Sequence, residues 1–216
     1  MNGTKKLGLL AIVAAVIVSG FKANVTGLGL QENELSINQE ILLEVRYFSQ
    51  KEGTYCGQAT TQMVLYAAQG IRVQQRDLED EMDYIKGKGT VNSNMIKPFK
   101  NRDANIISSG ILKNQKYLRN SVDKGYYTII NIRFSENSKS GHYVLVTGYN
   151  STGFYVHDPW PERWGRPEGR QTGENAYISA ESLQQLWWFR HNWALTVAGP
   201  DSIIQSVSPQ EVALCK

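Results

Sequence analysis

One stretch of the chain has a clear helical pattern. After Cys56, hydrophobic residues recur at the three- and four-residue spacing of a buried helical stripe, namely Ala59, Met63, Tyr66 and Ala67. Gly70 follows this stripe and is a suitable C-terminal stop for a helix. The pattern therefore predicts a buried helix that begins at Cys56.

Four further segments have a weaker helical pattern. They are residues 72–84, 93–100, 113–123 and 179–186. Leu78 and Met82 lie four residues apart among charged residues, which predicts a surface helix for the first of these segments. Ser93 and Ser179 are suitable N-caps for the second and the fourth, because a serine side chain can accept a hydrogen bond from the first turn.

Short runs of β-branched and aromatic residues predict strands for most of the remaining chain. The predicted strands are residues 41–47, 105–108, 126–132, 142–148, 154–158, 187–189 and 193–197. Residues 133–140 form a polar loop directly before Gly141, and residues 159–176 form a long loop rich in Gly, Arg, Glu and Trp. Long loops in compact domains often carry function, so we consider both loops as candidate walls of a binding cleft.

Two of these strands predict a β-hairpin, one beginning at His142 and the other ending at Asp158. Pairing that is symmetric about Asn150 would place these two residues directly opposite each other, with their Cβ atoms ~5 Å apart. A carboxylate in that position can accept a hydrogen bond from the imidazole and fix its tautomer. A two-residue loop at residues 151–152 would change the register and break this pairing.

A cysteine at the start of a helix is a candidate nucleophile. The unpaired N–H groups and the dipole at that end favour negative charge and so lower the thiol pKa. Free cysteine is also among the most buried residue types, so a small buried side chain is the alternative interpretation. The neighbourhood favours chemistry, because Gln50 lies six residues before Cys56 and Asp158 lies sixteen residues after His142.

The chain resembles the papain-like cysteine peptidases, most closely the bacteriocin-processing (double-glycine leader) peptidases, over about residues 47–197. The similarity rests on Gln50, on Cys56-Gly57, and on the blocks at residues 141–148 and 156–159. It implies an α+β papain-like fold in which the nucleophile helix packs on an antiparallel sheet. Gln58 departs from the family pattern, which often has proline after Cys-Gly.

The resemblance also assigns catalytic roles. It makes Cys56 the nucleophile, His142 the base, Asp158 the residue that orients the base, and Gln50 a donor of the oxyanion hole. These roles imply that the enzyme hydrolyses a peptide bond through a thioester. The implied partner is a peptide or protein substrate, and no cofactor is needed.

Residues next to the catalytic set are candidates for substrate contacts. They are Tyr55, Gly57, Gly141 and Trp160. Trp160 and Trp164 lie in the long loop, and they are as well suited to lining a groove as to covering the edge of the core. The aromatic run at residues 187–189 is more typical of a core than of a substrate site.

The other histidines do not indicate a second site. His157 has the opposite parity to Asp158 along its strand, so we expect its side chain on the other face of the sheet and do not assign it as the base. His191 fits a surface or hydrogen-bonded position. The three histidines are widely separated, which does not predict a metal site.

The first 23 residues have the pattern of a secretory signal peptide. Lys5 and Lys6 precede an apolar run, residues 7–20, that ends in small residues. A membrane-spanning helix needs ~20 apolar residues, so an uncleaved signal anchor is the second interpretation. We therefore divide the chain into a signal peptide at 1–23, a lead-in at 24–40 and a papain-like domain at 41–216. The protein is then secreted or periplasmic, without stable membrane insertion after cleavage.

The charge balance supports this division. The full chain has a formal charge of +3, from 23 basic and 20 acidic residues. The excess lies in the first 23 residues, which hold three lysines and no acidic residue. The remaining chain is neutral, whereas a nucleic-acid-binding protein needs a clustered basic face, so nucleic acid is not an expected partner.

The second cysteine, Cys215, is the penultimate residue. Chain termini are usually loose, so we expect two free thiols rather than a structural disulfide. An inhibitory bridge between Cys56 and Cys215, or a dimer through Cys215, stays open. The sequence does not indicate an oligomeric state.

Several enzyme classes share this Cys–His–Asp chemistry. Peptidases, amidases, deamidases and transglutaminases all form a thioester, and they differ in the substrate groove and in the group that attacks second. A peptide-binding domain with a vestigial site is the alternative from another class, but a decayed site would not require all three residues. Because the chain is predicted to be exported, cutting a leader peptide inside the cell is not expected, and a toxin or effector role stays open.

Overall fold

The computed structural model describes residues 40–160 and 173–200. The predicted signal peptide, residues 24–39 of the lead-in, Trp164 and Cys215 lie outside the described residues. The predictions that concern them are therefore not tested by the structure.

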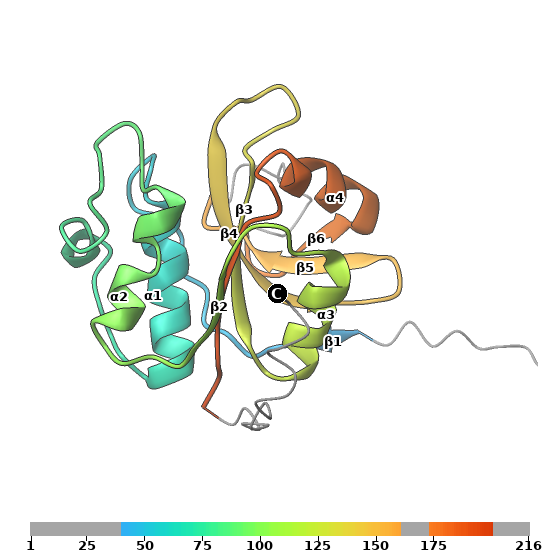
Figure 1. Ribbon diagram of the computed structural model, residues 1–216, viewed down its shortest axis with the longest axis horizontal. Coiled ribbons are helices and arrows are strands. Elements are labelled where there is room, and N and C mark those ends of the chain that lie inside the picture. Colours follow the sequence, from blue (N-terminus) through green and yellow to red (C-terminus); the bar gives the residue numbers. More distant parts are fainter. Residues whose placement is uncertain (1–39, 161–172, 201–216) are drawn as a thin grey trace, which may run out of the picture. The chain divides into compact units, whose positions relative to one another are not determined.

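The strands form one antiparallel sheet (Figure 1). Its order is β2-β7-β3-β4-β5-β6, and β1 pairs with the end of β4. The strands are β1 (Ile41–Leu42), β2 (Ile106–Gly110), β3 (Tyr127–Arg133), β4 (Gly141–Tyr149), β5 (Gly153–His157), β6 (Ala176–Ser179) and β7 (Ala194–Val197). The central strands β3 and β4 therefore have a neighbour on each side.

Helices cover both faces of this sheet. They are α1 (Cys56–Gln69), α2 (Lys97–Lys100), α3 (Gln115–Asp123) and α4 (Ala180–Trp188), with short 3-10 turns at Arg76–Leu78 and Asn92–Asn94. Helices α1 and α2 lie on one side, and α3 and α4 lie on the other (Figure 1). The fold is α+β, with the helix that carries Cys56 packed on an antiparallel sheet, as the sequence predicted.

Side chains alternate between the two faces along the central strands and build two hydrophobic cores. Ile129 and Leu145 belong to the core beneath α1 and α2, where they pack with Met63. Ile130 and Val144 belong to the core beneath α3 and α4. Because both faces are covered, β3 and β4 are hydrophobic along most of their length instead of alternating with polar residues.

The two ends of α1 are capped differently. At its C-terminus Gly70 adopts a left-handed φ of 67°, and its N–H donates to the carbonyl oxygen of Tyr66. At its N-terminus Tyr55 provides no side-chain cap, and the first turn contains no acidic residue. The predicted start and end of this helix are both confirmed, and its positive end is left without a neutralising side chain.

A β-bulge shifts the register of the hairpin formed by β4 and β5. Near the turn Tyr149 pairs with Phe154, which is the pairing predicted for a two-residue loop. An irregularity between Val146 and Gly148 then moves the register by one residue. From there to the end of β5 the two strands pair regularly again.

This register corrects the predicted pairing of His142 with Asp158. Extending the ladder by one residue beyond β5 places Asp158 opposite Val144, so His142 is its diagonal neighbour and not its direct partner. Without the bulge the two side chains would lie on opposite faces, because a shift of one residue exchanges the faces of a strand. The bulge therefore brings the imidazole and the carboxylate to the same face.

Two predicted elements are wrong. Residues 72–84 form one 3-10 turn and irregular turns instead of a surface helix, and Leu78 and Met82 are fully buried in the core. Their spacing reflects burial, not helical structure. The predicted strand at Trp187 is instead the end of α4, where Trp187 and Leu183 lie one helical turn apart and are both fully buried.

Other boundaries differ in detail. The strand predicted at residues 41–47 is confirmed only at Ile41–Leu42. Ser93 lies within a 3-10 turn and caps no helix, because α2 begins later with Ile96 as its N-cap. The predicted cap of α4 is confirmed, since the Ser179 side chain accepts the N–H of Ser182.

Candidate active site

Cys56 is the first residue of α1, and the imidazole of His142 lies close enough to its thiol to lower the thiol pKa. Burial raises the pKa of this thiol. The hydrogen bond and charge of His142, together with the N–H groups of Tyr143 and Gly57, outweigh burial and hold the pKa below its ordinary value. The thiol therefore ionises more readily than a free cysteine does.

Asp158 fixes His142 from the other side of the ring. Nε2 of His142 lies 2.6 Å from Oδ1 of Asp158, and the two side chains are only 2% and 0% exposed. Burial alone lowers the pKa of His142, but the charge and hydrogen bond of Asp158, together with those of Cys56, raise it to about 9. Because Nε2 is bound to the carboxylate, Nδ1 is the ring nitrogen left for the thiol.

Further contacts orient this pair. Oδ1 of Asp158 accepts the N–H of Trp160 at 2.9 Å, and its backbone carbonyl accepts the Tyr47 hydroxyl at 2.9 Å. The ring of Phe134 lies edge-on to the imidazole of His142 and to the ring of Trp160, with 5.4 Å between centroids in each case. These aromatic rings shield the ion pair from water.

Cys56 and His142 open onto a cleft of about 810 Å³, which we call the active-site cleft. Its walls include the loop at residues 87–93, and Gly141 and Trp160 also line it. These two predicted substrate contacts therefore lie at the cleft. It is large enough for several residues of an extended peptide.

The other two predicted substrate contacts do not line the cleft. Tyr55 is buried and packs edge-on against Tyr84, with 5.1 Å between the ring centroids. Gly57 is buried beneath the cleft, and a Cβ at this position would lie 3.0 Å from the sulfur of Met95. Both residues hold the start of α1 in place.

Gln50 lies next to the segment that follows β5 but is not among the residues that line the cleft. Its backbone N–H donates to the carbonyl oxygen of Pro159 at 2.9 Å, one residue after Asp158. Its side-chain Nε2 donates to the carbonyl oxygen of Glu52 at 2.8 Å. An amide NH₂ carries two hydrogens, so a second N–H remains for another acceptor.

The sequence matches the Peptidase_C39-like family over residues 42–184, which is more than half of the chain. The chain belongs to the Peptidase_C39-like family. It is therefore a cysteine peptidase, and the resemblance inferred from its motifs is confirmed.

Solved structures share the fold of this C39-like peptidase. A C39-like peptidase from Bacillus anthracis is 17% identical with a TM-score of 0.57. The peptidase domain of Streptococcus ComA, a bifunctional ABC transporter, is 19% identical with a TM-score of 0.55. A double-glycine-motif protease from an AMS/PCAT transporter, crystallised with its leader peptide, is 17% identical with a TM-score of 0.53. Each alignment covers 74% of this chain and 98% of the other. No curated protein matches the sequence.

Gln75 braces the loop that carries Gln50 in this C39-like peptidase. Its Nε2 donates to the carbonyl oxygen of Ser49, and its Oε1 accepts the N–H of Lys51, both at 2.9 Å. Gln75 is 1% exposed. The backbone on both sides of Gln50 is therefore fixed by one buried side chain, which no periodic signal in the sequence indicated.

His157 is a structural residue. Its Nε2 donates to the carbonyl oxygen of Val45 at 2.8 Å, and its Nδ1 accepts the N–H of Asn175 at 3.1 Å. Burial lowers its pKa, so the ring is neutral. Both nitrogens are used, which agrees with the prediction that His157 is not the base. His191 is exposed and lies at the edge of the active-site cleft.

The described residues contain no group of three or more His, Cys, Asp or Glu side chains arranged to hold a metal ion. Among the helices of residues 40–160 and 173–200, none is long and apolar enough to cross a membrane.

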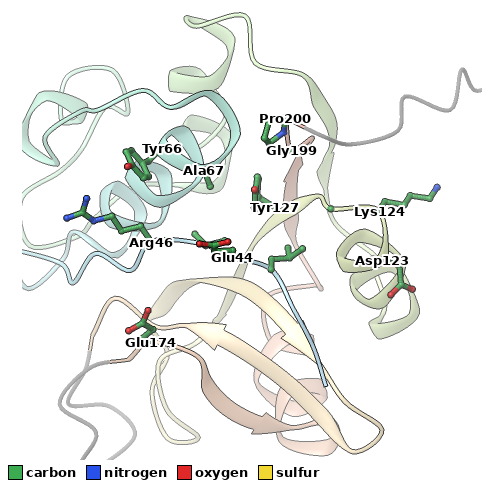
Figure 2. Close-up of a pocket in the computed structure, with 13 residues that line it drawn as sticks. Glu44, Arg46, Tyr66, Ala67, Asp123, Lys124, Tyr127, Glu174, Gly199 and Pro200 are labelled. Atoms are coloured by element: carbon green, nitrogen blue, oxygen red, sulfur yellow. The ribbon is translucent and has the colours of Figure 1, made fainter. Parts of the chain in front are cut away.

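A second hollow, of about 1100 Å³, shares no lining residue with the active-site cleft (Figure 2). Tyr66 of α1 and Tyr127 at the start of β3 line it, together with the charged residues Glu44, Arg46 and Lys124. The described residues around this hollow include neither a cysteine nor a histidine. It therefore lacks the nucleophile and base that peptidase chemistry requires.

Proposed function

We propose that this C39-like peptidase hydrolyses a peptide bond through a thioester, with Cys56 as nucleophile, His142 as base and acid, and Asp158 as the orienting residue. One observation carries this proposal. The buried contact of 2.6 Å between His142 and Asp158 lies beside a thiol at the uncapped end of α1. A structural cysteine would need no such pair, because thiols buried among apolar groups are inert.

The mechanism follows from the two pKa shifts. Between the lowered pKa of Cys56 and the value of about 9 for His142, the site holds a thiolate and an imidazolium. The sulfur attacks the carbonyl carbon, and His142 gives its proton to the leaving amine as the C–N bond breaks. The neutral imidazole then takes a proton from water, which attacks the thioester. The C–S bond breaks, the acid product leaves and the thiolate is restored.

The oxyanion formed in each attack needs donors aimed at it. The N–H of Cys56 is one candidate, because N–H groups in the first turn of a helix have no partner within the helix. The second N–H of the Gln50 amide is the other, as the family resemblance implies. Its position outside the unliganded cleft does not argue against this role, since catalytic hydrogen bonds often tighten only when substrate is bound.

Gln50→Ala is expected to lower kcat by ~10²–10³, the usual cost of losing one oxyanion donor. The melting temperature and the rate of iodoacetamide alkylation at Cys56 should stay close to those of the wild type, because alkylation forms no oxyanion. Steady-state kinetics, thermal melting and timed alkylation of the purified variant measure these three quantities.

Gln75→Ala is the matched control, because it removes the hydrogen bonds that hold the same loop. We expect it to lower the melting temperature, since a buried donor and acceptor lose their partner. It should reduce kcat per folded molecule less than Gln50→Ala does. If Gln50→Ala instead slows alkylation in parallel with turnover, Gln50 belongs to the scaffold and not to the oxyanion hole.

Hydrolysis can be separated from amide transfer with isotope-labelled water. A mixture of synthetic peptides incubated in H₂¹⁸O should yield fragments whose new C-terminal carboxyl group carries ¹⁸O, because water attacks the thioester. Mass spectrometry of the products detects this label. Release of ammonia from intact peptides, or unlabelled products joined to an added amine, would instead assign the chain to the deamidases or the transglutaminases.

We also propose that the enzyme acts outside the cytoplasm, as the signal-like pattern of residues 1–23 supports. The mature protein, collected from the periplasm or medium of an expressing bacterium, should then lack Met1 and begin near residue 21 or 24. Intact-mass measurement tests this expectation. Exported protein that retains Met1 would favour an uncleaved anchor.

A further inference from the structure

Arg190 lies at the wall of the active-site cleft, just after α4. No ion pair formed within residues 40–160 and 173–200 includes it. One terminal nitrogen donates to the carbonyl oxygen of Lys139, while the buried Nε has no hydrogen-bond partner in the described structure. Arg190 is thus a half-buried cation at the cleft that Cys56 and His142 also line, and its Nε–H donates to no acceptor in the described structure.

The surroundings of Arg190 favour an added anion. Burial lowers the pKa of Arg190, and the charge of Arg133 acts in the same direction, while Tyr143 opposes them. Both guanidinium groups lie against the ring of Phe189, 3.6 Å from its centroid for Arg133 and 5.2 Å for Arg190. Two like charges on one ring repel each other, so a carboxylate between Arg190 and solvent would be stabilised.

A second polar group lies at the same place. Asn131 is 8% exposed and lines the cleft, and its Nδ2 donates to Asn92 at 2.7 Å. Its Oδ1 is buried and has no partner among the described residues. A Cβ on Gly141 would lie 2.7 Å from this oxygen and 3.2 Å from a terminal nitrogen of Arg190. The acceptor oxygen of Asn131 and the cationic donor of Arg190 therefore both lie beside Gly141, the residue that precedes His142.

We propose that Arg190 and Asn131 form a carboxylate-binding subsite, which selects peptides that carry a carboxylate close to the scissile bond. This subsite rests on the peptidase function proposed above. A peptide residue offers the matching groups, because its main-chain N–H can donate to Asn131 and its carboxylate can accept two N–H groups of a guanidinium. The carboxylate is either an acidic side chain or the C-terminus of the substrate.

A purely structural role for Arg190 has a different consequence. If this residue only anchors the loop through Lys139 and packs on Phe189, its replacement lowers the melting temperature. The reactivity of the site toward charged and neutral molecules would then change by the same factor. The ratio of the two reactivities separates these roles.

The test compares the alkylation of Cys56 by reagents that differ only in charge. N-iodoacetyl-glycine and its amide probe a terminal carboxylate, and the iodoacetyl derivatives of glutamate amide and glutamine amide probe a side-chain carboxylate. Each rate is divided by the rate with glutathione. In the wild type we expect the charged member of at least one pair to react ~10–100-fold faster, because hydrogen bonds to charged groups contribute on this scale.

Arg190→Gln should abolish this preference. Arg133→Gln is the matched control, since Arg133 contacts the same ring but does not line the cleft, and it should keep the preference. If the glutamine variant does not fold, Arg190→Met keeps an unbranched apolar stem that can pack on Phe189, and it should also lose the preference. Which pair responds identifies the source of the carboxylate.

The outcomes distinguish failure of the subsite from failure of the enzyme. Fast reaction of Cys56 with iodoacetamide but no preference for a carboxylate in wild type overturns the subsite alone. A preference that survives in Arg190→Gln overturns it as well. If iodoacetamide reacts with Cys56 at neutral pH no faster than with glutathione, the thiolate is absent and the proposed peptidase function fails first.

Discussion

Replacing Cys56 with alanine is expected to remove all measurable peptide hydrolysis while the fold is retained. Loss of the nucleophile in covalent hydrolases costs ~10⁶ in kcat, which places the residual rate below ordinary detection. Alanine has the highest helix propensity, so the start of α1 should tolerate the change. Cleavage of a synthetic peptide mixture, measured by mass spectrometry, and thermal melting of the variant check the two parts of this expectation.

Cys215→Ala is the control for this substitution. It removes the other cysteine of the chain, which the proposed mechanism does not use, and hydrolysis should continue at the wild-type rate. Wild-type cleavage by Cys56→Ala would place the chemistry elsewhere. Loss of activity in Cys215→Ala, with Cys56 intact, would reopen a role for the second thiol.

His142→Ala should have the second largest effect, with kcat reduced by more than ~10³. General acid–base catalysis alone contributes ~10²–10⁴, and the variant also loses the charge that ionises the thiol. The pKa of Cys56 is held down chiefly by His142, against burial, which raises it. In the variant burial remains and the imidazole that lowers the pKa is gone, so the pKa of the thiol should rise.

This shift predicts a change in how alkylation depends on pH. A free thiol with a pKa of ~8.5 is only ~0.3% ionised near pH 6, whereas the wild-type thiol should still react rapidly there. His142→Ala should react at that pH no faster than a free thiol and should need alkaline solution. In the wild type, peptidase activity should fall as pH rises through about 9, where His142 loses its proton.

His157→Gln is the matched control for His142→Ala. His157 is also buried and directly precedes Asp158, but both of its nitrogens bind backbone groups. This variant should be less stable, yet its alkylation profile should match that of the wild type. If Cys56 in His142→Ala still reacts rapidly with the alkylating reagent near pH 6, another group ionises this thiol.

The parts of the fold governed by local spacing were predictable from the sequence. The stripe from Ala59 to Ala67 and the glycine at position 70 predicted where α1 begins and ends. Both ends of this helix depend only on residues within one or two turns. The order of Cys56, His142 and Asp158 was sufficient to propose the site. The contact between these side chains, in contrast, depends on the register of the strands, which the residue pattern predicts only weakly.

The bulge near Thr147 is the clearest example of what was missed. Symmetric pairing predicted that His142 and Asp158 lie directly opposite each other. In the structure they are diagonal neighbours, and one extra residue in β4 brings them to the same face of the sheet. A bulge changes a strand by a single residue and leaves the hydrophobic pattern of a doubly covered sheet unchanged. No pattern within β4 alone could have revealed it.

Contacts between segments that are distant in the sequence could not be predicted either. Gln75 lies in a segment predicted to be a surface helix, yet it holds the loop around Gln50. Arg190 lines the active-site cleft directly after α4, which continues to Trp188 where the sequence predicted a strand. Both depend on long-range packing, for which the sequence contains no periodic signal.

The thioester formed on Cys56 is the central claim, and it can be observed directly. Wild-type enzyme mixed with a cleaved synthetic peptide and quenched in acid within the first turnovers should carry the mass of the N-terminal fragment as an acyl group. Digestion and tandem mass spectrometry should locate that mass on Cys56, and hydroxylamine should remove it. Turnover with no acyl group on the protein, or with the acyl group on another residue, would contradict the mechanism.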